Sequence, residues 1–132
     1  MAGGVAVGVD VVHISAFRQQ LGVPGSTFES VFTARELRLA ATKLDRAEHL
    51  AGRWAAKEAF IKAWSQSIYG QSPLIDPDRV NFAEIEVVAD RFGRVAIVLT
   101  GEVATVAPAA QSLSISHDGD YAMAVCLVAG EE

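Results

Sequence analysis

The sequence predicts an α+β fold in which an antiparallel sheet packs against one long central helix and several shorter helices. Three observations carry this prediction. The chain opens with a β-rich apolar segment, its middle is rich in alanine and other helix formers, and its last third alternates short strand-like segments with tight turns. With 132 residues, the chain is expected to form one domain, because that length can bury a single core.

The first predicted element is a strand over Val5 to Ile14, where nearly every residue is apolar. Such a run predicts a buried central strand. It carries one carboxylate, Asp10, although aspartate is a poor strand former and is costly to bury. Asp10 therefore either ends the strand and caps something locally or has a function, and the second interpretation is preferred once the rest of the chain is considered.

Short helices are expected next. Ser15 is expected to cap a helix that ends near Leu21, and residues 26–32 form a further helical turn. Thr33 and Glu36 fit the capping-box pattern, in which each residue satisfies a backbone N–H of the other. A structural role is therefore the leading interpretation for both.

The long central helix is expected to begin after a cap at Asp45 and to end by Gly70. Lys57 lies within its apolar stripe, Glu58 lies beside that stripe, and Lys62 lies one turn beyond Glu58. Ionisable groups on a buried margin cost free energy unless a group outside the helix pairs with them. On periodicity alone, an ordinary Glu58–Lys62 ion pair worth a few tenths of a kcal/mol is favoured. At about 100° per residue, the stripe consists of Leu50, Trp54, Ile61 and Trp64.

The last third predicts two hairpins with a short helix between them, because alternating apolar segments are separated by turn residues. The first turn is expected at residues 90–93, with Gly93 at positive φ, and the second at residues 117–120. The predicted elements are, in order, strands 83–89 and 94–100, a helix over 102–107, and strands 112–116 and 121–128.

Composition excludes several classes of protein. A formal net charge of −5 argues against non-specific nucleic-acid binding. The sequence shows no signal peptide and no apolar stretch long enough to span a bilayer, so a cytoplasmic protein without a membrane segment is expected. The single Cys126 is expected to be a small buried hydrophobe.

Two carboxylates from different elements, Asp10 and Glu58, would suit a hard cation such as Mg²⁺. Nearby lysines and arginines would match a phosphorylated ligand. Lys43, Arg46 and Arg53 could form a small cationic patch, although charges on a helix are usually only solvated. Ser116 and His117 could donate to a phosphate, but the simpler interpretation of a lone turn histidine, an exposed or backbone-bonded side chain, is favoured at this point.

Taken in order, several motifs resemble the holo-acyl-carrier-protein synthase family, the small 4′-phosphopantetheinyl transferases. The most specific is the segment Arg53-Trp54-Ala55-Ala56-Lys57-Glu58-Ala59. The resemblance spans nearly the whole chain and implies a single phosphopantetheinyl transferase domain over residues 1–132. The other motifs, in family order, are Gly8–Val11, Phe32–Leu37, Glu84–Val87, Gly93–Arg94, Ser114–Asp118 and Tyr121–Ala124.

This resemblance implies transfer of the 4′-phosphopantetheine arm of coenzyme A to a serine of an acyl carrier protein, as in fatty acid biosynthesis. Adenosine 3′,5′-bisphosphate is the by-product. Asp10 and Glu58 would bind Mg²⁺, Glu58 would act as the base, and Lys62 would stabilise or protonate the leaving phosphate. The role of Lys57 stays open.

The resemblance also implies contacts to coenzyme A from other parts of the chain. Ser116 and His117 match the Ser–His pair that contacts the 3′-phosphate, and Arg46 and Arg53 are secondary candidates. The implied assembly is a homotrimer with active sites between subunits, in which Ser116 and His117 come from the neighbour of the chain that supplies the carboxylates.

Two positions depart from the family pattern. Larger relatives have a further acid two residues after the strand aspartate, where this chain has Val12, so a water must fill that coordination position. Many bacterial members have a strongly basic first helix that docks the carrier protein, but here residues 15–20 contain one positive charge, Arg18. The acceptor could therefore be a carrier domain of a type I fatty acid synthase. Two other functions remain as alternatives: a non-catalytic coenzyme A-binding or assembly subunit, and a Mg²⁺-dependent hydrolase of small phosphoesters.

Overall fold

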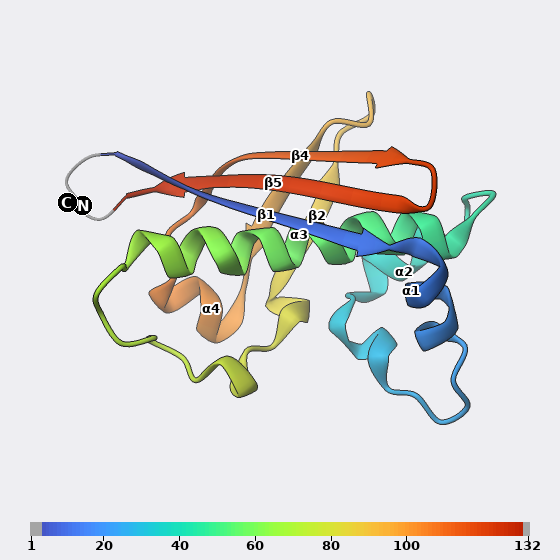
Figure 1. The fold of residues 1–132 in the computed structure, drawn as a ribbon, viewed down its shortest axis with the longest axis horizontal. Coiled ribbons are helices and arrows are strands. Elements are labelled where there is room, and N and C mark those ends of the chain that lie inside the picture. The colour runs from blue at the N-terminus through green and yellow to red at the C-terminus, as the bar shows by residue number, and fades with distance from the viewer. Residues whose placement is uncertain (1–3, 131–132) are drawn as a thin grey trace.

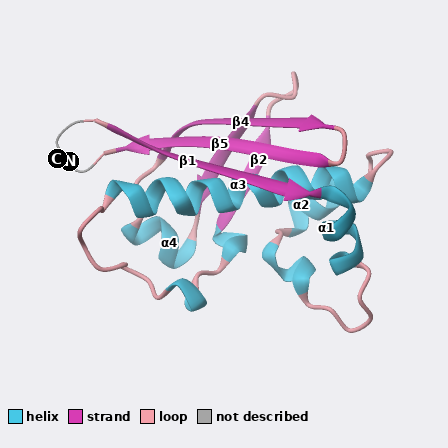
Figure 2. Cartoon of the chain, in the orientation of Figure 1, coloured by secondary structure: helices cyan, strands magenta, loops and turns pink. Residues whose placement is uncertain are grey.

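A computed structural model describes residues 4–130 and shows a three-stranded sheet lying along one long helix, with smaller helices on the other side of that helix (Figure 1). A separate two-stranded hairpin crosses behind them. Figure 2 shows that the three-stranded sheet lies on one side of the long helix and the smaller helices on the other. The α+β prediction is confirmed. The elements are β1 (Val5–His13), α1 (Ile14–Leu21), η1 (Phe28–Val31), α2 (Ala34–Ala40), α3 (Arg46–Ser67), η2 (Pro77–Arg79), η3 (Phe82–Glu84), β2 (Ile85–Ala89), β3 (Val95–Leu99), α4 (Gly101–Val106), β4 (Ala110–Asp118) and β5 (Tyr121–Ala129).

The larger sheet has the strand order β1-β5-β4, and both pairings are antiparallel. β1 is thus an edge strand, so the prediction of a buried central strand is wrong. Its side chains alternate: Ala6, Gly8 and Val12 are buried, while the valines between them are exposed. The strand is apolar throughout, yet only one of its faces is covered within the chain. The outward residues Val5, Val7, Val9 and Val11 are 58%, 53%, 49% and 56% exposed.

The long helix α3 supplies most of the core beneath this sheet. Its alanines at 51, 55, 56, 59 and 63 are fully buried, because small side chains let the strands approach the helix closely. At Gly8 an added Cβ would overlap the carbonyl oxygen of Ala59. Glycine at this position therefore allows β1 to lie directly on α3. Of the predicted apolar stripe, Leu50 and Trp64 are buried, whereas Trp54 and Ile61 are partly buried.

Helix caps and turns follow local sequence with one exception. Thr33 and Glu36 form the predicted capping box, and the side chain of Asp45 accepts from the N–H of Glu48. The predicted cap at Ser15 is wrong: the N-cap position is His13, two residues earlier, and the N–H of Ile14 donates to the carbonyl of Asp120 at 2.8 Å. β1 runs directly into α1, so the β4–β5 turn satisfies the start of that helix.

Lys57 and Glu36 form an ion pair inside the protein, with both side chains fully buried and Nζ 2.9 Å from Oε1. The Lys57 ammonium also donates to the carbonyls of Phe82 and Ile85, at 3.0 and 2.6 Å. Glu36 accepts in turn from the N–H of Val87. The pair therefore joins α2, α3 and the start of β2. These contacts give Lys57 a structural role.

Two further sequence expectations concern Cys126 and the membrane. Cys126 is fully buried and free, and burial raises the pKa of its thiol to about 11. Among residues 4–130, no helix has the length and apolar character needed to cross a membrane.

Candidate active site

Asp10 and Glu58 come together where β1 crosses the middle of α3. Asp10 is the one charged residue of the strand, and it points to the helix side because Val9 and Val11 point outward. Lys62, one turn beyond Glu58, donates to Asp10 with Nζ 2.9 Å from Oδ1. The lysine thus bridges helix and strand rather than pairing within the helix, so the simple Glu58–Lys62 ion pair is not what the structure shows.

Both carboxylates line a shallow, open groove of about 410 Å³ between β1, α1 and α3. The floor of the groove is apolar and includes Val12, Phe17 and Trp54. Phe17 and Trp54 both pack edge-on against Phe28, with ring centroids 5.4 and 5.2 Å apart. Aromatic side chains packed against one another thus line the groove beside the carboxylates.

The groove changes the acidity of Glu58. Partial burial raises the pKa of its carboxyl, the nearby Asp10 charge raises it further, and Lys62 partly offsets both effects. Two acids forced together in a partly desolvated position favour a cation between them. Among the described residues no group of three or more His, Cys, Asp or Glu side chains could hold a metal. Two carboxylates nevertheless suit Mg²⁺, which typically keeps several waters and takes phosphate oxygens as further ligands.

A second cluster, of basic residues, surrounds the first half of α3. The ring of His117 lies over Gly52, where an added Cβ would be 2.8 Å from Nε2, and this nitrogen is 3.3 Å from the carbonyl of Glu48. Arg53 is 9% exposed, and burial lowers the pKa of its guanidinium. We call His49, Arg53, His117 and Lys43 the basic cluster. Arg53 and Lys43 carry the lasting positive charges of this cluster, so an anion would be stabilised there.

His49 belongs to this cluster although nothing in the sequence analysis singled it out. Burial, then the charges of Arg53, Lys43 and His117, lower the pKa of His49 to about 4. Its Nε2 is buried without a hydrogen-bond partner in the part of the chain that the structure describes. Sequence spacing could have identified His49 as a member of the cluster, because His49, Gly52 and Arg53 stand at i, i+3 and i+4 and therefore share one helix face.

We expect His49 to make the fold sensitive to acid. Because its folded-state pKa is about 4, against 6.5 for an ordinary histidine, the unfolded chain binds the proton first as the pH falls. Stability is thus lost between these two values. Urea unfolding measured across this range should give a flatter pH dependence for His49→Gln than for the unmodified protein. Parallel curves for the two proteins would contradict the prediction.

Two of the predicted residues lie apart from these clusters. Arg46 pairs with Glu29, with Nη2 2.9 Å from Oε1. Ser116 is adjacent to His117 on β4, but alternation along the strand places the two on opposite faces. Ser116 pairs with Met123, which is 42% exposed, whereas His117 pairs with the buried Ala122.

The carboxylate groove and the basic cluster do not meet within one chain. Asp10 pairs with Ala124, and Ala124 pairs with Ile115, two residues before His117. Two strand spacings therefore separate Asp10 from β4, which is on the order of 10 Å. Along α3, Glu58 is six residues beyond Gly52, or about 9 Å. A ligand that used both clusters would be long or would lie between two chains.

A carboxylate pair with a lysine and a separate basic cluster, set on this arrangement of helices and hairpins, would suit a phosphorylated ligand. The chain belongs to the 4′-phosphopantetheinyl transferase superfamily, whose family model matches residues 6–126.

Within that superfamily the chain is similar to holo-acyl-carrier-protein synthases. It is 56% identical to the one from Corynebacterium efficiens over 131 residues, which cover 94% of this chain and 93% of that protein. The corresponding Mycobacterium tuberculosis protein is 44% identical over 128 residues, covering 96% and 97%.

Solved structures agree with this similarity. The ACPS–CoA complex of Chronobacterium ammoniagenes superposes with a TM-score of 0.93 at 60% identity, covering 98% of this chain and 99% of that one. The holo-acyl-carrier-protein synthase of Helicobacter pylori in complex with coenzyme A gives 0.67 at 26% identity, covering 94% and 99%.

Proposed function

We propose that this chain is a holo-acyl-carrier-protein synthase that transfers the 4′-phosphopantetheine arm of coenzyme A to a serine of an apo acyl carrier protein. The other product is adenosine 3′,5′-bisphosphate. The observation that carries the proposal is the meeting of Asp10 and Glu58 in one open groove, with Lys62 hydrogen-bonded to Asp10. The similarity to synthases of known name, and to two structures that contain coenzyme A, supports it.

Asp10 and Glu58 would hold Mg²⁺. Val12, which faces the same side as Asp10, is 9% exposed and contributes no oxygen, so water would complete the ligand set. When bound, Mg²⁺ neutralises charge on the transferred phosphoryl group and positions the pyrophosphate.

The residues of the chain then promote one displacement reaction at the β-phosphorus of coenzyme A. The serine hydroxyl attacks the β-phosphorus, the bond from that phosphorus to the bridging oxygen breaks, and the α-phosphate leaves with the adenosine. Glu58 accepts the hydroxyl proton, which its raised pKa favours. The side chain of Lys62 is 52% exposed, so its ammonium, which contacts Asp10, is also open to the leaving phosphate.

The basic cluster would bind the 3′-phosphate of coenzyme A. His117 and Arg53 carry donors suited to phosphate oxygens, and the positive charges of Arg53 and Lys43 favour an anionic ligand. Ser116 stays a candidate through its hydroxyl, but it faces the other side of β4 from His117, so the two would not share one phosphate within a chain. Arg46 is a secondary candidate because it must first leave Glu29.

We propose a homotrimer with active sites between subunits. The separation of the carboxylate groove from the basic cluster supports this arrangement, since a neighbouring chain could bring its cluster to the groove. The exposed valine face of β1 supports it too: four outward valines on one strand form an apolar surface of the kind that marks interfaces.

We expect Val9→Asp to convert the trimer into a folded monomer without transferase activity, because a charge on the valine face opposes burial. Val23→Asp is the matched control, since Val23 is similarly exposed, at 55% against 49% for Val9, and lies outside the strand. Light scattering after size exclusion gives the mass. A monomeric parent protein with full activity at high dilution would refute the trimer.

Arg18, on α1, indicates how strongly charge contributes to docking of the acceptor carrier protein. Its guanidinium makes two 2.9 Å hydrogen bonds to Asp45, so the one cation of α1 is already engaged. We infer that charge contributes little to docking, as expected for a carrier domain of a type I fatty acid synthase. Modification rates at low and high salt should then be equal, whereas a steep fall with salt would indicate a charge-steered acidic carrier protein.

Mass spectrometry tests the transfer directly. Incubating the protein with coenzyme A, Mg²⁺ and several apo carrier proteins should add one phosphopantetheine group to an acceptor, and a chelator should prevent the addition. Binding of coenzyme A without any mass gain would favour a non-catalytic subunit. Release of a cleaved product without an acceptor would favour a phosphoester hydrolase.

A further inference from the structure

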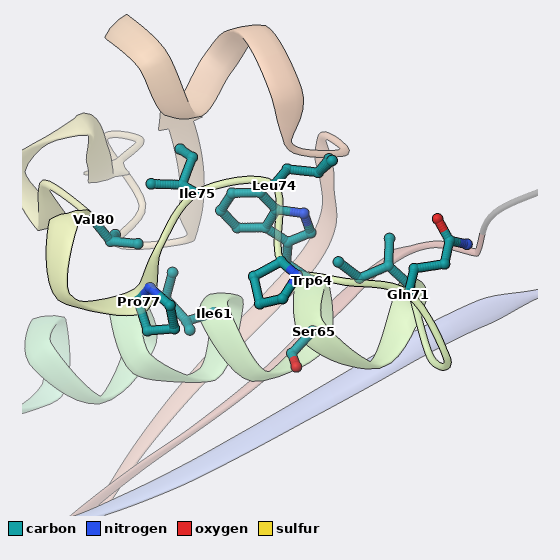
Figure 3. Close-up of a pocket in the computed structure, with 10 residues that line it drawn as sticks. Ile61, Trp64, Ser65, Gln71, Leu74, Ile75, Pro77 and Val80 are labelled. Atoms are coloured by element: carbon teal, nitrogen blue, oxygen red, sulfur yellow. The ribbon is translucent and has the colours of Figure 1, made fainter.

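A compact apolar pocket lies on the underside of α3, away from both clusters described above. The C-terminal half of α3 forms one wall, and the segment 68–80 folds back to form the other (Figure 3). The pocket has a volume of about 120 Å³, and its walls are almost entirely aliphatic and aromatic. The lining side chains used below are Ile61, Trp64, Ser65, Gln71 and Leu74.

One polar atom inside this pocket lacks a partner. Trp64 is 6% exposed, and its indole nitrogen donates to no acceptor among the residues that the structure describes. Figure 3 shows the nitrogen-bearing edge of the indole turned toward the side where Leu74 and Gln71 lie. A buried donor without an acceptor costs free energy of about 1–3 kcal/mol, so a ligand acceptor at this position would recover it.

The surroundings favour an organic ligand over water. A buried water is held well only by two to four polar partners. The polar side chains of the pocket, Ser65 and Gln71, belong to exposed residues at its rim. By size, a 150 Å³ cavity in another protein takes benzene, so this pocket suits a group of about that size or slightly smaller.

We propose that this pocket binds a short neutral acyl group, with the Trp64 indole N–H donating to its carbonyl oxygen. An acyl group combines an apolar chain with one acceptor, which matches apolar walls with one donor. The source of that group is an acyl-coenzyme A donor, and this part of the inference rests on the proposed function.

Position supports that source. Ile61, at the near wall of the pocket, lies one helical turn beyond Glu58, about 4.5 Å along the α3 axis. The phosphopantetheine arm is much longer than this rise, so the acyl end of a donor whose pyrophosphate lies at Asp10 and Glu58 would pass around α3 to reach the pocket on its underside. The walls carry no charged side chain, so an acidic acyl group such as a dicarboxylic half-thioester should be disfavoured.

Nuclear magnetic resonance of the ¹⁵N-labelled protein tests binding without relying on catalysis. The Trp64 indole N–H is assigned by its loss in Trp64→Phe, and the Trp54 indole serves as internal reference. N-methylbutanamide and butanoyl-coenzyme A should both shift the Trp64 signal in a saturable manner, while coenzyme A alone should not. If neither acyl ligand shifts the Trp64 signal, or if coenzyme A alone shifts it equally, the pocket does not bind an acyl group. If N-methylbutanamide shifts the signal and butanoyl-coenzyme A does not, the acyl group does not come from an acyl-coenzyme A donor.

Leu74→Lys provides a matched variant that should keep the fold, because Leu74 is 58% exposed. A charge at the pocket should abolish both acyl-dependent shifts while the Trp54 signal stays in place. Retention of the shifts in this variant would contradict the assignment.

Kinetics give a second readout. In Trp64→Phe, the kcat/KM for butanoyl-coenzyme A relative to that for coenzyme A should fall about fivefold, the worth of one neutral hydrogen bond. An unchanged ratio would overturn the acyl site. Absence of transfer from either donor in the unmodified protein would instead refute the proposed function.

Discussion

Glu58→Gln is expected to lower kcat by at least about 10²–10⁴-fold, the range typical for loss of a general base. The substitution also removes one of two carboxylates that would hold Mg²⁺, so the loss should lie toward the upper end. The fold should persist and gain slightly in stability at neutral pH. Burial and Asp10 raise the pKa of Glu58, so its ionised form is disfavoured in the folded state, and the amide removes that charge.

Transfer assays with an apo carrier protein, together with thermal unfolding, check this expectation. Glu102→Gln is the matched control, since Glu102 is exposed on α4 away from the groove. Wild-type turnover in Glu58→Gln would remove Glu58 from the proposed role, and an unfolded variant would show that the carboxylate is structural.

Lys57→Met should lower the free energy of unfolding by about 3–5 kcal/mol, the usual cost of removing one partner from a buried ion pair. Both side chains of the Lys57–Glu36 pair are 0% exposed. The variant would leave the charge of Glu36 buried and would also leave the carbonyls of Phe82 and Ile85 without their donor. Urea unfolding measures the difference.

Two comparisons separate charge from shape. Lys43→Met replaces an exposed lysine and should change stability by less than about 0.5 kcal/mol. The double variant Lys57→Met with Glu36→Gln should recover part of the loss, because it removes both charges. Equal stability of Lys57→Met and the unmodified protein would mean that the pair contributes nothing measurable.

Much of the fold follows from local sequence. The caps at Thr33 and Asp45, the turn at Gly93 and the length of α3 depend on groups close together in the chain, and all match the predictions. The place of β1 in the sheet was predicted wrongly for a physical reason. An uninterrupted apolar run indicates that both faces of a strand are hydrophobic. It does not indicate whether the second face is covered by the same chain or by another one.

For the candidate site, too, some residues could be selected from the sequence and others only from the structure. Asp10, Glu58, Lys62 and His117 were selected from unusual residue types in unusual places and from a family resemblance. His49 was not selected, because a histidine on a helix is unremarkable until Arg53 and His117 are seen beside it. Lys57 belonged to the most specific motif, yet only its three acceptors show that it stabilises the fold.

The sequence by itself determined the order of the main elements, the caps at Thr33 and Asp45, the hairpin turns, and the family to which the chain belongs, because these depend on short-range chemistry and on motif order. Tertiary structure alone decided that Lys62 pairs with Asp10 rather than Glu58, that Lys57 is buried with Glu36, and that the carboxylates and the basic cluster lie apart. The reason is distance along the chain. Lys62 and Asp10 are 52 residues apart in sequence, and only the packing of β1 on α3, which Gly8 permits, brings them into contact.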